Sequence, residues 1–110
     1  MSYFEILFFL MVGHALADYP LQGDFLSNAK NRNTPIGKIF WPHALTAHSL
    51  IHGGFVAILT GSVALGLAET IIHGITDWLK CENIISLNTD QIVHIACKFV
   101  WAYLALFIVM

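Results

Sequence analysis

Hydrophobic positions along the chain fall into four apolar stretches that are separated by shorter polar segments. The stretches cover residues 3–18, 42–60, 63–80 and 89–110. Apolar runs of this length are typical of helices rather than strands. The pattern therefore predicts an all-α fold, a four-helix bundle, in a single domain over residues 1–110.

Individual residues set the expected helix ends. Pro42 suits the first turn of the second helix, where a missing N–H costs nothing. Gly61-Ser62 predicts a tight reversal between the second and third helices. We expect Asn88 or Thr89 to cap the fourth helix with a side-chain oxygen.

The polar residues are most frequent between the first two helices, over residues 19–41. Residues 22–30 are expected to form a short surface helix, and the Asn-, Thr- and Pro-containing segment after them a loop. The bundle thus carries its largest polar connection at one end.

Composition then changes the picture from a soluble bundle to a membrane protein. The chain of 110 residues is 57% hydrophobic and 11% charged, whereas soluble domains are about 25% charged. Because small domains leave much of their surface outside the core, we expect lipid to solvate the excess apolar surface. We predict a multi-pass integral membrane protein built from transmembrane helices.

The first apolar stretch has a second interpretation, a signal peptide, because it ends in Ala15-Leu16-Ala17. Signal peptides begin with a positive region, but the first charge is Glu5 and the first basic residue is Lys30. We therefore expect a retained membrane helix.

Charge and cysteine content exclude other classes. The net charge is −2, so no basic footprint indicates a nucleic-acid partner. Cys81 and Cys97 lack the spacing of a metal or redox motif.

Basic residues gather at one end of the bundle, at Lys30, Arg32, Lys38 and Lys80. Positive loops favour the cytoplasmic side.

The ionisable residues within the helices gather at that same end. Because successive helices alternate in direction, the end of the first, the start of the second, the end of the third and the start of the fourth share one leaflet. The candidate metal ligands there are His14, Asp18, His48, His52, His73, Asp77 and His94.

These residues form pairs four positions apart, such as His48 with His52 and His73 with Asp77. Such pairs share one helix face, and facing pairs build metal sites in helix bundles. Imidazole and carboxylate ligands suit zinc, manganese or iron, in one site or in a two-metal site. Charged residues inside a membrane are costly and are therefore functional candidates.

Other residues have supporting roles in this hypothesis. Glu69 is the expected general base, and Lys80 with Gln22 would orient a charged substrate, although Lys80 could simply reach the membrane surface. Asp90 would bridge or support the metal, and we place Gln91 and Asp24 beside the substrate or ligands. His43, Glu5, Glu82 and Lys98 receive no catalytic role.

The sequence blocks 13–22 (GHALADYPLQ), 47–52 (AHSLIH), 69–80 (ETIIHGITDWLK) and 90–94 (DQIVH) resemble the bacterial and phage membrane family labelled domain of unknown function 3307. That family is similar in turn to membrane proteins described as metal-dependent hydrolases, and more remotely to zinc-dependent phospholipases C and nucleases. The resemblance implies zinc and a bacterial inner (plasma) membrane location.

The resulting hypothesis is a metal-dependent hydrolase of a phosphoester, including a lipid-linked one, with its polar site towards the cytoplasm. Three alternatives stay open: an ion or proton transport module, a non-enzymatic phage or bacterial membrane factor, and a bis-histidine haem protein. Gly53-Gly54 would allow close helix approach in a homo-oligomer.

Overall fold

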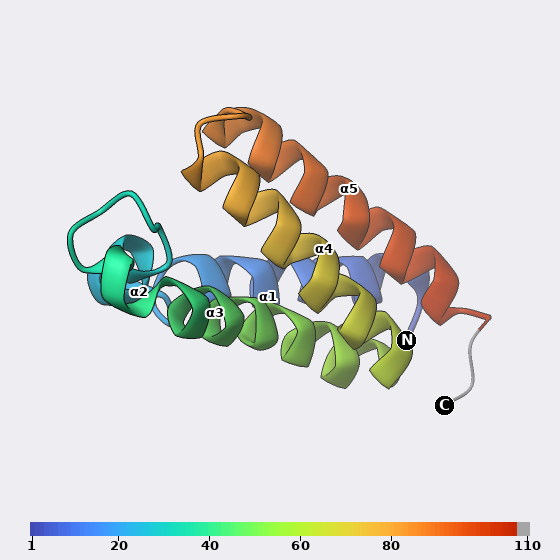
Figure 1. The fold of residues 1–110 in the computed structure, drawn as a ribbon. Helices are drawn as coiled ribbons and strands as arrows, with labels where there is room; N and C mark the ends of the chain where they lie inside the picture. Colours follow the sequence, from blue (N-terminus) through green and yellow to red (C-terminus); the bar gives the residue numbers. More distant parts are fainter. Residues whose placement is uncertain (108–110) are drawn as a thin grey trace.

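The computed structural model describes residues 1–107, which form five helices and no strand (Figure 1). The helices are α1 (Tyr3–Asp18), α2 (Gly23–Ala29), α3 (Gly37–Thr60), α4 (Val63–Cys81) and α5 (Leu87–Ala105). The prediction of an all-α fold with a short helix in the first polar connection is confirmed.

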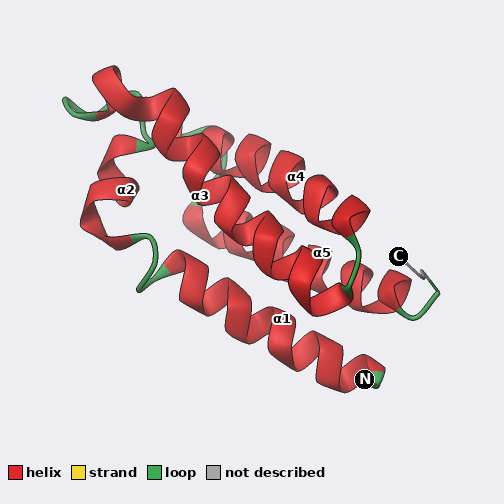
Figure 2. Cartoon of the chain, turned by 90° about the horizontal axis from the view of Figure 1, so that it is seen from below, coloured by secondary structure: helices red, strands yellow, loops and turns green. Residues whose placement is uncertain are grey.

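The four long helices form a closed bundle. Helix α1 packs against α3 and α5, and α4 packs against the same two helices. Helix α2 packs on α3, and Figure 2 shows it turned away from the axis of α1 at one end of the molecule. The bundle measures 44 × 22 × 21 Å, so its polar end lies far from the chain's N-terminus.

Helix α3 begins at Gly37, and the prediction of a start at Pro42 was wrong. Thr34 explains the earlier start, because its hydroxyl accepts a hydrogen bond from the Gly37 N–H (2.9 Å) and its carbonyl accepts one from the Lys38 N–H (3.1 Å). Pro42 therefore lies inside the helix, where it removes one backbone hydrogen bond.

Helix α5 also begins earlier than predicted. Ser86, rather than Asn88 or Thr89, is the N-cap, and its hydroxyl accepts a hydrogen bond from the Thr89 N–H (3.1 Å). The helix ends at Ala105 instead of continuing further. The predicted portion over residues 108–110 lies outside the described residues.

The predicted reversal between α3 and α4 is confirmed. Gly61 adopts the left-handed conformation (φ 73°), and the Ser62 side chain caps α4 by accepting from the Leu65 N–H. Glycine adopts the left-handed backbone conformation at a lower free-energy cost than any other residue.

Two glycines let α3 and α4 approach through their backbones. A Cβ atom added to Gly53 would lie 2.6 Å from the Gly66 carbonyl oxygen, and one added to Gly66 would lie 2.7 Å from the Gly53 carbonyl oxygen. Gly53 is thus used within the chain, whereas Gly54 faces open space.

The bundle buries polar side chains and exposes apolar ones over much of its length. Its buried polar residues include His48, His52, Glu69, His73, Asp77, Asp90, His94 and Lys98. The outward faces carry large apolar residues, such as Phe4 (78% exposed) and Ile58 (79% exposed). A water-soluble helix bundle shows the opposite arrangement.

An apolar core fills the remaining part of the interior. It consists of Ile6, Leu10, Val56, Leu65, Trp101 and Ala102. Within the described chain, no helix on its own is both long enough and apolar enough to cross a membrane; α1 and α2 taken together, bent by 80° at their break, meet that condition by length and composition.

Candidate metal centre

Four side chains from three helices converge inside the polar half of the bundle. Asp18 ends α1, His48 and His52 lie on α3, and His73 lies on α4; one ligand atom from each is within 4.8 Å of all the others. The Nε2 atoms of His48 and His52 lie 3.4 and 2.8 Å from the Asp18 Oδ1 atom. Ligand atoms of tetrahedral zinc lie roughly 3.3 Å apart, so small side-chain movements would enclose an ion.

Two of these histidines have ring nitrogens without a hydrogen-bond partner. Among the described residues, neither nitrogen of His48 and neither nitrogen of His73 has a hydrogen-bond partner, and the contact of His48 with Asp18 is an ion pair at 3.4 Å. Burying a polar group without a partner costs free energy, and buried polar atoms in proteins are nearly always paired. A cation between these rings and Asp18 would supply the missing partner.

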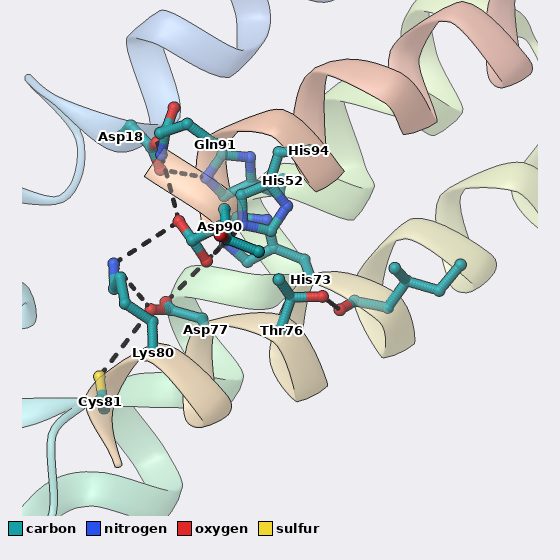
Figure 3. Close-up of polar contacts among 12 residues, drawn as sticks. Asp18, His52, His73, Thr76, Asp77, Lys80, Cys81, Asp90, Gln91 and His94 are labelled. Atoms are coloured by element: carbon teal, nitrogen blue, oxygen red, sulfur yellow. Dashed lines mark hydrogen bonds and ion pairs between the residues drawn. The ribbon is translucent and has the colours of Figure 1, made fainter. Parts of the chain in front are cut away.

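The imidazole rings of His52 and His73 stack on each other, and the stack continues to His94, which lies outside the group of four (Figure 3). The ring centroids of His52 and His73 are 3.7 Å apart, and those of His73 and His94 are 4.0 Å apart, with planes inclined by 20° and 17°. His94 is held by Asp90, whose Oδ1 atom lies 3.0 Å from the His94 Nε2 atom. The structure therefore places His94 beside the group of four rather than within it.

Asp18 has a different neighbour on each carboxylate oxygen. Its Oδ1 atom faces the two histidines of α3, while its Oδ2 atom lies 3.3 Å from His14 Nε2 and accepts a hydrogen bond from Gln91 Nε2 (3.1 Å). Gln91 also contacts His14 through its side-chain oxygen (3.1 Å). Asp18 thus connects the two histidines of α3 with His14 and Gln91, while the role expected for Asp90 stays a prediction.

Asp77, another predicted ligand, is held by two lysines. Its Oδ2 atom lies 2.8 Å from Lys30 Nζ, and its Oδ1 atom lies 3.1 Å from Lys80 Nζ. The nearest histidine nitrogens are further away, 3.7 Å for His48 and 3.9 Å for His73. Asp77 thus adjoins the centre and links it to the two ammonium groups.

Sequence reasoning missed Lys30. The residue was expected at the end of a short surface helix, with no role in the centre, but only 4% of it is exposed, and its ammonium group also donates to the Gln22 side-chain oxygen. The hydrophobic pattern did not indicate this burial. Lys30 directly follows the short helix, and the direction of its side chain depends on how α2 packs on α3.

A cavity of about 210 Å³ borders this centre at Asp18. It is lined by Asp18, Tyr19, Gln22, Ser27, Lys30, Lys80, Leu87 and Gln91. Gln22 is fixed at its wall, because its side-chain amide donates to the Asp18 carbonyl (2.9 Å). Gln22, Lys80 and Gln91 thus line the same cavity as Asp18, while their roles towards a substrate stay predictions.

Two predicted residues have other surroundings than the four. Asp24 is exposed on α2, where it lines a neighbouring pocket with Asp18 and Gln22, and its position beside a substrate stays a prediction. Glu69 is fully buried, one turn from His73, in an ion pair with Lys98 and a hydrogen bond from Trp101 (3.3 Å). Both oxygens of Glu69 therefore have partners of their own.

The loop that follows α2 forms hydrogen bonds with Glu82, the C-cap residue of α4. Arg32 donates through two nitrogens to Glu82, and Asn33 donates to the same carboxylate (2.7 Å). The hydrogen bonds from Arg32 hold the pKa of Glu82 below its usual range, and the pKa of Arg32 is raised by the same pair. This contact holds the loop next to the helix end that carries Lys80.

Comparison with known proteins identifies the family. No curated protein and no solved structure matches the chain. The family model described as protein of unknown function (DUF3307) matches residues 6–110 and so covers all four sequence blocks that carried the resemblance. The chain therefore belongs to the DUF3307 family.

Proposed function

We propose that this protein is a membrane-embedded, metal-dependent phosphoester hydrolase. The observation that carries the proposal is the convergence of Asp18, His48, His52 and His73 within 4.8 Å of one another. The buried nitrogens of His48 and His73 add to it, because they have no hydrogen bond to any described residue and a metal ion would supply a partner.

The donor set favours a borderline divalent metal. Three imidazoles and one carboxylate suit zinc best and also accept manganese or iron. Both cysteines are free thiols, and neither belongs to the group of four. A divalent ion in such a site lowers the pKa of a water molecule towards 7 and stabilises charge on a phosphoryl oxygen.

The chain's own residues would bind the substrate and move the proton. Lys80 and Gln22 line the cavity and would orient the charged group. Asp18 is the carboxylate among the lining residues, so we assign proton acceptance to its Oδ2 atom, which Gln91 orients. The contacts of Glu69 favour a structural part over the role of general base.

The distribution of apolar surface supports a membrane location. Large apolar side chains cover the outside of the long helices, while charged and imidazole groups occupy one part of the inside and the apolar core the rest. In lipid this arrangement is favourable, since exposed apolar faces need no protein partner. The basic residues of the polar connection, such as Arg32 and Lys38, favour a cytoplasmic location for the end that carries the centre.

The transport alternative requires a polar path through the whole bundle. The ion pair of Glu69 with Lys98 extends the polar interior by one step beyond His73. The next layer within the described chain is the apolar core around Leu10 and Val56. This barrier favours a closed catalytic centre over a conduit.

Elemental analysis of the detergent-purified protein tests the proposal. We expect a stoichiometric transition metal in the wild type and its loss in His73→Ala. His43→Ala is the matched control, because His43 is exposed on the same helix as two of the ligands. A wild-type protein without transition metal would contradict the proposal.

Activity separates the hydrolase from its alternatives. The metal-loaded protein should hydrolyse a chromogenic phosphomonoester, and His73→Ala should not. Bound metal without turnover would support the non-enzymatic membrane factor instead, whereas a haem absorption band in the purified protein would support the bis-histidine alternative.

A further inference from the structure

We infer that the cavity beside the metal centre binds phosphate or a phosphomonoester group, and that it does so only when the metal is present. The inference rests on the proposed function, because it requires an occupied metal centre. It names the substrate group and couples its binding to the metal.

The two lysines of the cavity are arranged for an anion. Lys30 directly follows α2, and Lys80 lies at the end of α4. Both nevertheless line the same cavity, and each contacts a different carboxylate oxygen of Asp77. Lys30 is almost completely buried, and 24% of the Lys80 side chain is exposed. Lysine ammonium groups bind phosphate as compact point charges. Because the Lys80 side chain is partly exposed, it can turn towards a phosphate in the cavity.

The charges around the cavity explain the dependence on metal. Three carboxylates, those of Asp18, Asp77 and Asp90, surround the two ammonium groups. With neutral imidazoles the sum is one negative charge, which disfavours an anion. A divalent cation bound by Asp18 and the histidines changes the sum to one positive charge, so the cavity then attracts an anion.

The coupling must be reciprocal. If the metal raises the affinity for phosphate, phosphate raises the affinity for the metal by the same factor.

The cavity volume of about 210 Å³ leaves room for a phosphate group. The hydroxyl of Ser27 lines the same space and can donate a hydrogen bond to a tetrahedral anion.

The phosphoryl group could belong to a soluble compound or to a lipid headgroup. Apolar residues stand at the cavity, where Tyr19 is 73% exposed and Leu87 is 61% exposed. Both sources present the same phosphomonoester chemistry to Lys80 and the metal, so they are distinguished by competition.

Calorimetric titration with inorganic phosphate tests the inference on detergent-purified full-length protein, zinc-loaded and chelator-stripped. We expect binding to the loaded protein and at least tenfold weaker binding to the stripped protein. Lys80→Gln should weaken phosphate binding by roughly tenfold to a hundredfold, as expected for a lost hydrogen bond to a charged group. Lys38→Gln is the control, because Lys38 is exposed and does not line the cavity.

Lys80 is preferred to Lys30 for this test because its partial exposure makes its loss less damaging to the fold. Metal content is measured on every sample. Loaded protein that binds no phosphate, or Lys80→Gln protein with full metal and unchanged phosphate affinity, would overturn the inference and leave the metal centre intact. Wild-type protein without metal would instead contradict the proposed function.

Competition then assigns the source of the group. Reconstitution into phosphatidylcholine vesicles with added phosphatidic acid should weaken phosphate binding if a lipid is the natural ligand. A water-soluble phosphomonoester should compete instead if the ligand is soluble. Competition by neither would overturn the assignment of the cavity to phosphomonoesters.

Discussion

The ammonium group of Lys98 on α5 pairs with the carboxylate of Glu69 on α4, and both side chains are almost completely buried. Trp101 donates a further hydrogen bond to the same carboxylate. The pair explains two residues that the sequence alone left unresolved, because Lys98 had no role and Glu69 was read as a general base. Each charge is stabilised at this depth by the other.

Removing one partner should therefore destabilise the protein strongly. We expect Lys98→Met to lower the free energy of unfolding by about 3–5 kcal/mol, because it leaves a buried carboxylate unpaired. The double variant Lys98→Met/Glu69→Leu should recover most of that loss, since no charge is left behind. Denaturant unfolding in detergent measures both values. A general base would behave differently, with Glu69→Gln losing activity at unchanged stability.

The close contact of Gly53 with Gly66 leads to a second prediction. Gly53→Ala would place a methyl group 2.6 Å from a backbone carbonyl, so α3 and α4 must separate. Overpacking of this kind costs typically 1–3 kcal/mol, and it should also weaken metal binding because His52 is the neighbouring residue. Thermal unfolding and metal content check the two effects.

Gly54→Ala provides the matched control. The added methyl group meets open space, and alanine is favoured over glycine within a helix by up to about 1 kcal/mol. The variant should be as stable as the wild type or more stable, with unchanged metal content. Equal effects of the two substitutions would show that the backbone contact is unimportant.

Spacing along each helix was enough to predict much of the centre. His48 and His52 share one face because they are four residues apart, and the alternating direction of the helices brings Asp18 and His73 to the same depth. Both arguments follow from helix geometry alone, so they needed no knowledge of tertiary packing.

The remaining assignments depended on packing that spacing does not reveal. Asp77 shares a face with His73, yet Lys30 and Lys80 hold its carboxylate beside the centre. Lys30 is buried because α2 folds onto α3, and the start of α3 was misplaced because the Thr34 hydroxyl accepts a hydrogen bond from the Gly37 N–H, ahead of Pro42. Such relationships join residues from separate elements, so one helix's pattern does not contain them.

The ion pair between Arg32 and Glu82 should make stability depend on pH. Its hydrogen bonds lower the pKa of Glu82 in the folded state. The contribution is therefore fully present above the ordinary carboxyl pKa of about 4.3, and it is lost as the pH falls through the lower folded-state value. The difference in melting temperature between wild type and Glu82→Gln should be positive at pH 7 and shrink below pH 4. A difference that does not change with pH would contradict this role.

Metal removal provides the last prediction. A ligand that binds only the folded state stabilises it by about 4 kcal/mol at a thousandfold excess over its dissociation constant, so a chelator should lower the melting temperature of the wild type. His73→Ala should not respond to the chelator, and His43→Ala should respond as the wild type does.

Lowering the pH from 7.5 to 5.5 should act in the same direction as the chelator, because the ligand imidazoles must be neutral to bind a metal, whereas those of the unfolded chain take up protons near their ordinary pKa of about 6.5. This effect should be smaller in His73→Ala, which has lost one of these rings and with it the bound ion. If His73→Ala and the wild type respond equally to chelator and to acid, the ion lies outside the group formed by Asp18, His48, His52 and His73. The unpaired nitrogens of His73 would then need another partner.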